Sequence, residues 1–153
     1  MAGSFSLGQV ITPFTSVYSS NSQGNIAIIG NTLMTCPAGG TCAAAQGGGA
    51  AQNNSYNMVQ VDIDGIGGTA NSSSANFTLP SGATVVWAGL FWGASSNSGQ
   101  RGTVQFSTPT SAYAATTGAV SATGSNYHAF AVVTARVQAG GSGTYTVGGI
   151  RLT

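Results

Sequence analysis

Apolar and polar residues alternate over short runs along this chain, which is the period of a β-strand, and no long segment has helical spacing. Turn-forming clusters separate the runs, for example at residues 64–68, 79–82 and 140–143. Short strands between glycine-rich turns predict an all-β fold, an antiparallel β-sandwich, jelly-roll-like, of about eight to ten strands. The predicted strands are residues 13–18, 25–35, 56–63, 75–79, 84–92, 103–107, 127–137 and 144–152.

The length of 153 residues is that of one domain. We expect residues 1–20 to form an N-terminal extension or donor-type strand, and residues 21–153 to form a single β-sandwich domain. The low-complexity stretch AAAQGGGAAQNN at residues 43–54 predicts a flexible loop.

The run TVVWAGLFW at residues 84–92 is the most apolar predicted strand. Because successive side chains of a strand alternate between its faces, Val86, Leu90 and Trp92 share one face. Trp87 and Phe91 share the other. Both faces therefore need cover, one from the facing sheet and the other from a loop of the same chain or from a neighbouring subunit.

The N-terminal segment is strand-like but has no obvious hairpin partner in the sequence. Phe5, Leu7 and Ile11 share one parity in it. The segment is interpreted either as the first strand of its own sandwich or as a strand added to the sheet edge of another copy. In the second case, Val86, Leu90 and Trp92 are expected to lie in or beneath the assembly contact.

Charged side chains are scarce. The chain has no lysine and no glutamate, and charged residues make up 3% of it, against about 25% in an average soluble domain. A formal net charge of +1 excludes the basic patch that nucleic-acid binding needs, and it argues against binding to anionic membranes. No apolar run reaches the length of about 20 residues that membrane insertion as a helix requires. A surface with so little charge favours association between copies.

Cys36 and Cys42 enclose the five-residue loop PAGGT. The alternatives are a disulfide and two free buried thiols, because one spare histidine does not complete a zinc site. We favour the disulfide, which would stabilise the short loop and indicates an oxidising location, extracellular or at the cell surface.

Asp62 and Asp64 are the only carboxylate side chains. They begin a D-x-D-G sequence, which resembles the start of a calcium loop, and they are the candidate calcium ligands. The alternative is that they pair with an arginine or accept hydrogen bonds at the turn. A glycosidase pair is disfavoured, because no aromatic residues are visibly arranged as a sugar cleft around them.

Catalytic motifs are missing from the sequence. His128 is the single histidine and no G-x-S-x-G nucleophile turn accompanies it. A P-loop needs a lysine, which the chain lacks. We therefore expect no enzymatic activity and no cofactor other than calcium. Without lysine, isopeptide cross-links between lysine and asparagine are also excluded, so any polymer must be noncovalent.

Several stretches of the sequence carry a resemblance to known proteins. They are NIAIIGNTLMTC at 25–36, VDID at 61–64, NSSSA at 71–75, LPSGATVVWAGLFWGA at 79–94, Arg101, TP at 108–109 and VQAGGSGTYTV at 137–147. These stretches resemble a family of secreted bacterial surface proteins, common in actinobacteria, that often carry "conserved repeat" β domains (domain of unknown function 11). The resemblance implies an extracellular or cell-wall location and a structural or adhesive role, and it supplies no catalytic residues. This chain departs from the family in its low charge and its early end.

These observations predict a structural extracellular protein that self-assembles noncovalently into a filament, sheath or surface layer, with other copies of itself as its partners. The alternative is a monomeric adhesive or carbohydrate-binding head on the cell surface. Its ligand would be a polysaccharide, and calcium at Asp62 and Asp64 could support the binding.

Overall fold

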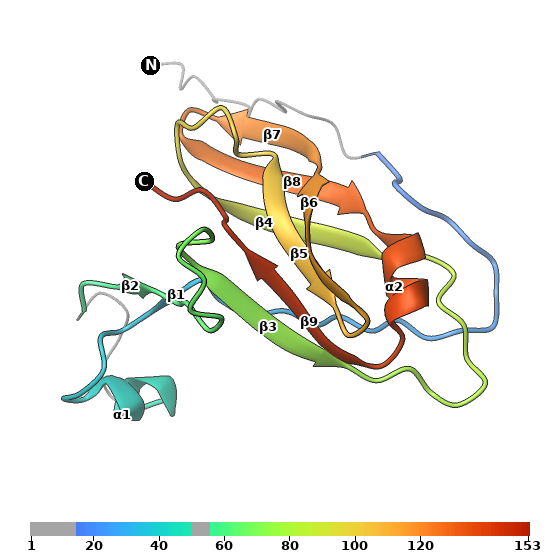
Figure 1. The fold of residues 1–153 in the computed structure, drawn as a ribbon, viewed down its shortest axis with the longest axis horizontal. Coiled ribbons are helices and arrows are strands. Elements are labelled where there is room, and N and C mark those ends of the chain that lie inside the picture. Colours follow the sequence, from blue (N-terminus) through green and yellow to red (C-terminus); the bar gives the residue numbers. More distant parts are fainter. Residues whose placement is uncertain (1–14, 50–55) are drawn as a thin grey trace, which may run out of the picture.

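The computed structural model describes residues 15–49 and 56–153 of the chain. Two antiparallel sheets pack face to face, which confirms the predicted all-β sandwich (Figure 1). The four-stranded sheet has the order β3-β9-β5-β6, formed by Ser72–Phe77, Gly143–Gly148, Thr103–Thr108 and Ser111–Thr117. The three-stranded sheet has the order β4-β8-β7, formed by Gly89–Ser95, Asn126–Val132 and Ala119–Thr123.

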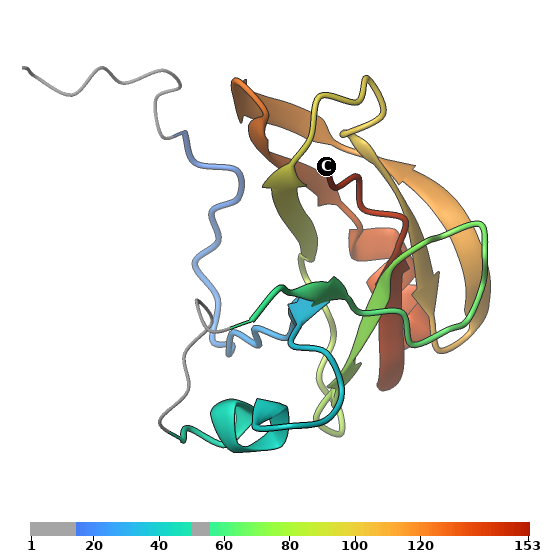
Figure 2. The same ribbon diagram turned by 90° about the vertical axis from the view of Figure 1, so that its left-hand side faces the viewer.

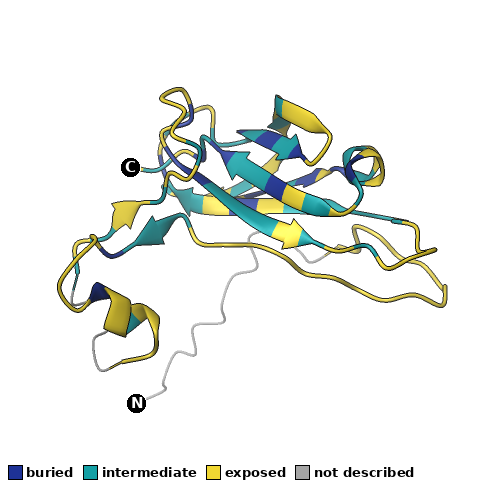
Figure 3. Ribbon diagram, turned by 60° about the horizontal axis from the view of Figure 1, so that its bottom comes forward, coloured by how far each residue is buried: buried dark blue, intermediate teal, exposed yellow. Residues whose placement is uncertain are grey.

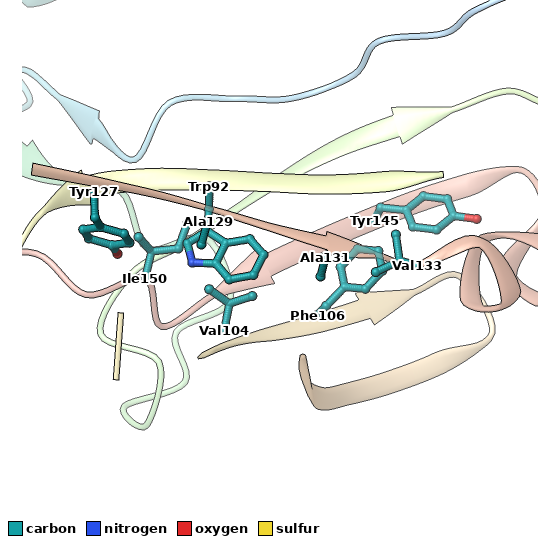
Figure 4. Packing of buried hydrophobic residues seen from close by; sticks show 9 residues of the cluster. All are labelled: Trp92, Val104, Phe106, Tyr127, Ala129, Ala131, Val133, Tyr145 and Ile150. Atoms are coloured by element: carbon teal, nitrogen blue, oxygen red, sulfur yellow. The ribbon is translucent and has the colours of Figure 1, made fainter. Parts of the chain in front are cut away.

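The core lies between the two sheets. In β5, Val104 and Phe106 are buried while their neighbours in the strand are half-buried, as expected for a strand with one inward face. Ala129 of β8 is fully buried, and its small side chain leaves room for the larger rings around it. The buried cluster consists of Trp92, Val104, Phe106, Tyr127, Ala129, Ala131, Val133, Tyr145 and Ile150 (Figure 4).

A small lobe lies beside the sandwich. It contains the two-stranded ladder of β1 (Met34–Thr35) and β2 (Val59–Gln60) and the short helix α1 (Cys42–Gln46). Cys36 and Cys42 form a disulfide in this lobe, with a Cα–Cα distance of 5.7 Å, which confirms the predicted bond. Such a bond is compatible with an extracellular location.

The second helix, α2 (Thr134–Gly140), covers one end of the sandwich (Figure 1). Its Arg136 reaches back between the sheets, where the guanidinium lies 4.6 Å from the centre of the Phe106 ring. The same group donates hydrogen bonds to the backbone carbonyl of Phe106 and, over 2.7 Å, to the hydroxyl of Thr116. The helix is therefore tied to the four-stranded sheet by a cation–π contact and by hydrogen bonds.

Several predicted boundaries were wrong. The strand predicted at 84–92 begins only at Gly89 and continues to Ser95. The strand predicted at 127–137 ends at Val132, and α2 follows it directly. Of the strand predicted at 25–35, only Met34–Thr35 is paired. The loop predicted at 43–54 is in part helical, because α1 extends to Gln46.

Thiol labelling tests the disulfide. We expect a maleimide reagent to label neither cysteine of the native protein until a reductant is added, because the two sulfurs are joined covalently. Reduction should lower the free energy of unfolding by about 2–3 kcal/mol on the loop-entropy model, measured by urea denaturation. A Cys36→Ser/Cys42→Ser variant should match the reduced protein. Labelling of both cysteines without reductant would contradict the bond.

Candidate functional site

The candidate assembly residues of the tryptophan-rich segment differ in how far they are buried. Trp92 of β4 is 6% exposed and belongs to the core, and its indole N–H donates to the carbonyl of Arg101 over 3.0 Å. Leu90 is partly buried against the same core. Val86, which precedes the strand, is 61% exposed. Trp92 and Leu90 therefore lie on the core side of the sheet, whereas Val86 is exposed in the segment before the sheet begins.

The outer surface of the three-stranded sheet carries a row of aromatic rings. Phe91 of β4 is 65% exposed, and its ring centre lies 4.6 Å from that of Phe130 of β8. Trp87 stacks on Phe130 at 6.1 Å, and Tyr18 stacks on Trp87 at 5.4 Å. We call these four residues the outer aromatic face. Large contiguous apolar patches at protein surfaces are often sites of interaction, so this face is a candidate site.

Gly89 makes this arrangement of rings feasible. A Cβ atom at residue 89 would lie 2.6 Å from both the Phe130 ring and the Trp87 ring. Any larger residue there would push the two rings off the sheet. The absence of a side chain at this position therefore lets the rings lie flat across the start of β4.

The backbone of β4 is paired along one side. At one end of the strand, the N–H of Val133 donates to the carbonyl of Ala88 over 2.9 Å. At the other end, the N–H of Ser96 donates to the carbonyl of Ser125 over 2.7 Å. Because bonding and non-bonding pairs alternate in an antiparallel ladder, the even-numbered residues of β4 bond to β8. The odd-numbered residues direct their N–H and C=O groups away from β8; they are Gly89, Phe91, Gly93 and Ser95.

Part of this second side is covered by the end of the chain. The N–H and the hydroxyl of Thr153 both donate to the carbonyl of Ser95, over 2.8 and 2.9 Å. Within residues 15–49 and 56–153, β4 pairs with no strand other than β8. The stretch from Gly89 to Gly93, which we call the β4 edge, is thus an unpaired strand edge beside the outer aromatic face.

The predicted donor residues Phe5, Leu7 and Ile11 lie outside the described residues. The segment that follows them, residues 15–32, is extended and exposed at every position (Figure 3). It runs beside the sandwich on the side of the three-stranded sheet (Figure 2). Ile26 and Ile28 in it are 85% and 93% exposed. Apolar side chains with this exposure gain stability only when another surface covers them.

Asp62 and Asp64 organise the turn that leads into β3. One carboxylate oxygen of Asp62 accepts hydrogen bonds from the backbone N–H of Gly65 and the hydroxyl of Ser72, over 3.2 and 3.0 Å. Asp64 accepts from the backbone N–H of Ile66 over 2.7 Å and from the hydroxyl of Tyr113 over 2.5 Å. The alternative of hydrogen bonding at the turn is thus what the structure contains. Calcium binding stays a prediction, which a calcium-dependent rise in melting temperature that is lost in Asp62→Asn would support.

The hydrogen bonds around Asp64 alter its acidity. Partial burial opposes ionisation, but the bonds from Tyr113, Ile66, Ser72 and Thr69 outweigh it and hold the pKa of Asp64 below its usual value. Burial raises the pKa of Tyr113, and its bond to the Asp64 carboxylate raises it further. The ionised Asp64 and the neutral Tyr113 therefore stabilise each other.

The arginines are held by neutral partners. Arg101 donates to the carbonyls of Ser96 and Gly124, over 3.3 and 3.2 Å. Arg151 donates to the side-chain carbonyl of Gln100 over 2.6 Å. His128 is exposed on β8, opposite Gly93 and Ser121 in the register of the sheet. These contacts hold loops and strand ends of the sandwich.

Scans against models of known protein families, against curated proteins and against solved structures found no match to this chain. In the described part of the chain, no helix has the length and apolar character that crossing a membrane requires. The function must therefore be argued from the surface itself.

Sequence reasoning missed three residues that shape these sites. Tyr113 lies on β6, a strand rich in alanine and threonine that was not predicted, so its contact with Asp64 was not foreseen. The role of Gly89 was missed because it depends on the packing of the Trp87 and Phe130 rings, which only the folded structure brings together. The exposure of Phe91 could have been predicted from the sequence. Trp92 and Phe91 lie on opposite faces of the strand, so assigning the face of Trp92 to the core would have placed Phe91 on the surface.

The contact between Tyr113 and Asp64 predicts a pH-dependent stability. Because the folded-state pKa of Asp64 is lowered, its contribution is present above its unfolded pKa and is lost as the pH falls through the folded value. Tyr113→Phe should lower the free energy of unfolding by about 0.5–1.5 kcal/mol at neutral pH, and the loss should shrink at acidic pH. Urea denaturation at several pH values measures both effects.

The matched control is the Asp64→Asn variant with and without Tyr113→Phe. In a double-mutant cycle the effect of Tyr113→Phe should largely disappear once the carboxylate is gone. An equal effect in both backgrounds would show that the tyrosine hydroxyl does not act through Asp64.

Proposed function

We propose that the protein is an extracellular structural subunit that self-assembles noncovalently into a filament, sheath or surface layer. The observation that carries the proposal is an unpaired β4 edge beside an exposed aromatic face, in a domain with almost no charge. Each feature alone favours association between proteins, and here they occur on one side of one sheet.

The low charge removes the usual protection of a sheet edge. Natural proteins blunt exposed edges with charged side chains, lysine above all, or with proline and bulges. In this chain lysine is absent, and the exposed edge residues Phe91 and Gly93 carry no charge. Repulsion between copies is also weak at a formal net charge of +1. Neither charged side chains on the edge nor repulsion between copies would therefore oppose the addition of a strand to the β4 edge.

The donor in this proposal is the N-terminal segment of another copy. Phe5, Leu7 and Ile11 share one face of an extended segment, with Gln9 interrupting it, so an added strand formed by this segment would have one mostly apolar face. The first charged residue of the chain is Asp62, so the whole N-terminal region meets a neighbour without desolvating a charged side chain. The resemblance to secreted bacterial surface proteins and the disulfide Cys36–Cys42 support an extracellular location.

Removal of the N-terminal segment tests this proposal. A protein lacking residues 2–12 should remain monomeric and folded but should not assemble, because in the described part of the chain the first residue packed against the core is Leu33. Light scattering and far-ultraviolet circular dichroism measure assembly and folding. A Phe5→Ser/Leu7→Ser variant of the full chain should reproduce the loss. Normal assembly of both proteins would contradict the donor role of the segment.

A carbohydrate-binding head is the second candidate, favoured by the aromatic face itself. Sugar rings stack on exposed aromatic rings, and Tyr18 and Phe91 at its two ends are 43% and 65% exposed. In this case soluble polysaccharide should quench the fluorescence of Trp87 in a monomeric protein. Phe91→Ala should weaken binding about tenfold, whereas Val120→Ala, a change away from the outer face, should not. Unchanged fluorescence across a glycan panel would remove this candidate.

A further inference from the structure

We propose that the β4 edge is the acceptor site of assembly, and that its occupant is residues 5–11 of a second copy of the chain. This inference rests on the proposed function and goes further, because it selects one of the four edges of the two sheets and names the surface that the incoming side chains cover.

The β4 edge offers backbone groups that the sandwich leaves unused. The N–H and C=O groups of Gly89, Phe91 and Gly93 point away from β8, as the pairing of Ala88 and Ser96 requires. Among residues 15–49 and 56–153 no backbone group bonds to them, and an added strand would satisfy them in the assembly. Two of the three residues are glycines, so at these two positions no side chain blocks the approach of another backbone.

The edge formed by β3 is partly occupied. The N–H of Ser72 donates to the carbonyl of Val61 over 2.9 Å. The carbonyl of Ser74 accepts from the side chain of Asn31 over 3.3 Å. A strand added to β3 would have to displace both contacts, so β3 is the poorer acceptor.

The remaining two edges are less suitable for other reasons. The pairing of β5 with β6 has a register shift between Phe106 and Thr108, and bulges of this kind twist an edge away from regular pairing. Tyr113 of β6 is also tethered to Asp64. Directly before β7, the N–H of Gly118 donates to the carbonyl of Gly102 over 2.8 Å, so the start of that edge is already in use. By elimination, β4 is the edge most open to a new strand.

The side chains of the donor fit the two faces that an added strand would meet. Phe5, Leu7 and Ile11 share one parity and would lie against the outer aromatic face, next to Phe91. The other parity of residues 5–11, which is Ser6, Gly8 and Val10, would face the core side of the sheet with two small residues and one apolar residue.

Amide hydrogen exchange on the unmodified full chain tests the acceptor directly. In the monomer, the amides of Phe91 and Gly93 should exchange rapidly, because no residue in the described ranges 15–49 and 56–153 accepts a hydrogen bond from them. In the assembled protein their exchange should slow at least about tenfold. The outward amides of Ala115 and Thr117 on the β6 edge should keep their monomer rates.

Variants of the full chain give a second test. Phe91→Pro removes an outward N–H without breaking a bond to β8, so it should abolish assembly and leave the fold intact. Phe91→Leu keeps that N–H and should still assemble. Ala115→Pro makes the same backbone change on the β6 edge and should also assemble. If Phe91→Pro does not fold, the exchange experiment on the unmodified chain decides the question.

The outcomes separate the two proposals. Assembly that protects the amides of β6 but not those of β4 would overturn the acceptor assignment and leave the proposed function standing. Protection of the β4 amides that is independent of protein concentration would show that the chain's own segment occupies the edge, which also overturns it. A chain that stays monomeric at every concentration would overturn the acceptor and the proposed function together.

Discussion

The packing of β5 against β8 is the contact on which the rest of the structure depends. Val104 and Phe106 from one sheet meet Ala129 and Ala131 from the other, and Trp92 lies within the same cluster (Figure 4). Because these inward residues hold the sheets together, the opposite parity of the three-stranded sheet is turned outward. The exposed aromatic rings are therefore a consequence of how the core is built.

The second constraint is how the few charges are used. Arg136 lies against Phe106, Arg101 lies over the ring of Tyr127 with a centroid distance of 5.9 Å, and Asp64 accepts bonds at a turn. These charges stabilise ends and corners of the sandwich. None of the three lies on the β4 edge, so the surface that we assign to assembly has neither the repulsion nor the specificity that charged residues would give it. Its selectivity must come from backbone pairing and shape.

The sequence predicted the fold class and the disulfide, because alternation and cysteine spacing are local signals. It did not predict β6 or β7, since their alanine, serine and threonine residues have no apolar period, and it did not predict α2, whose residues continue the apolar run of β8. The apolar character of both faces of the 84–92 segment was recognised, but which face is inward depends on the facing sheet. The alternation therefore identified which residues of the segment share a face. Only the tertiary structure showed that the face of Trp92 is buried in the core and that Phe91 is exposed.

Negative-stain electron microscopy of the purified protein at neutral pH, with light scattering of the same sample, tests the central claim most directly. We predict regular filaments or sheets and a scattering mass that rises with protein concentration. Discrete particles of 15.0 kDa at every concentration would contradict self-assembly and would direct attention to the aromatic face as a ligand site.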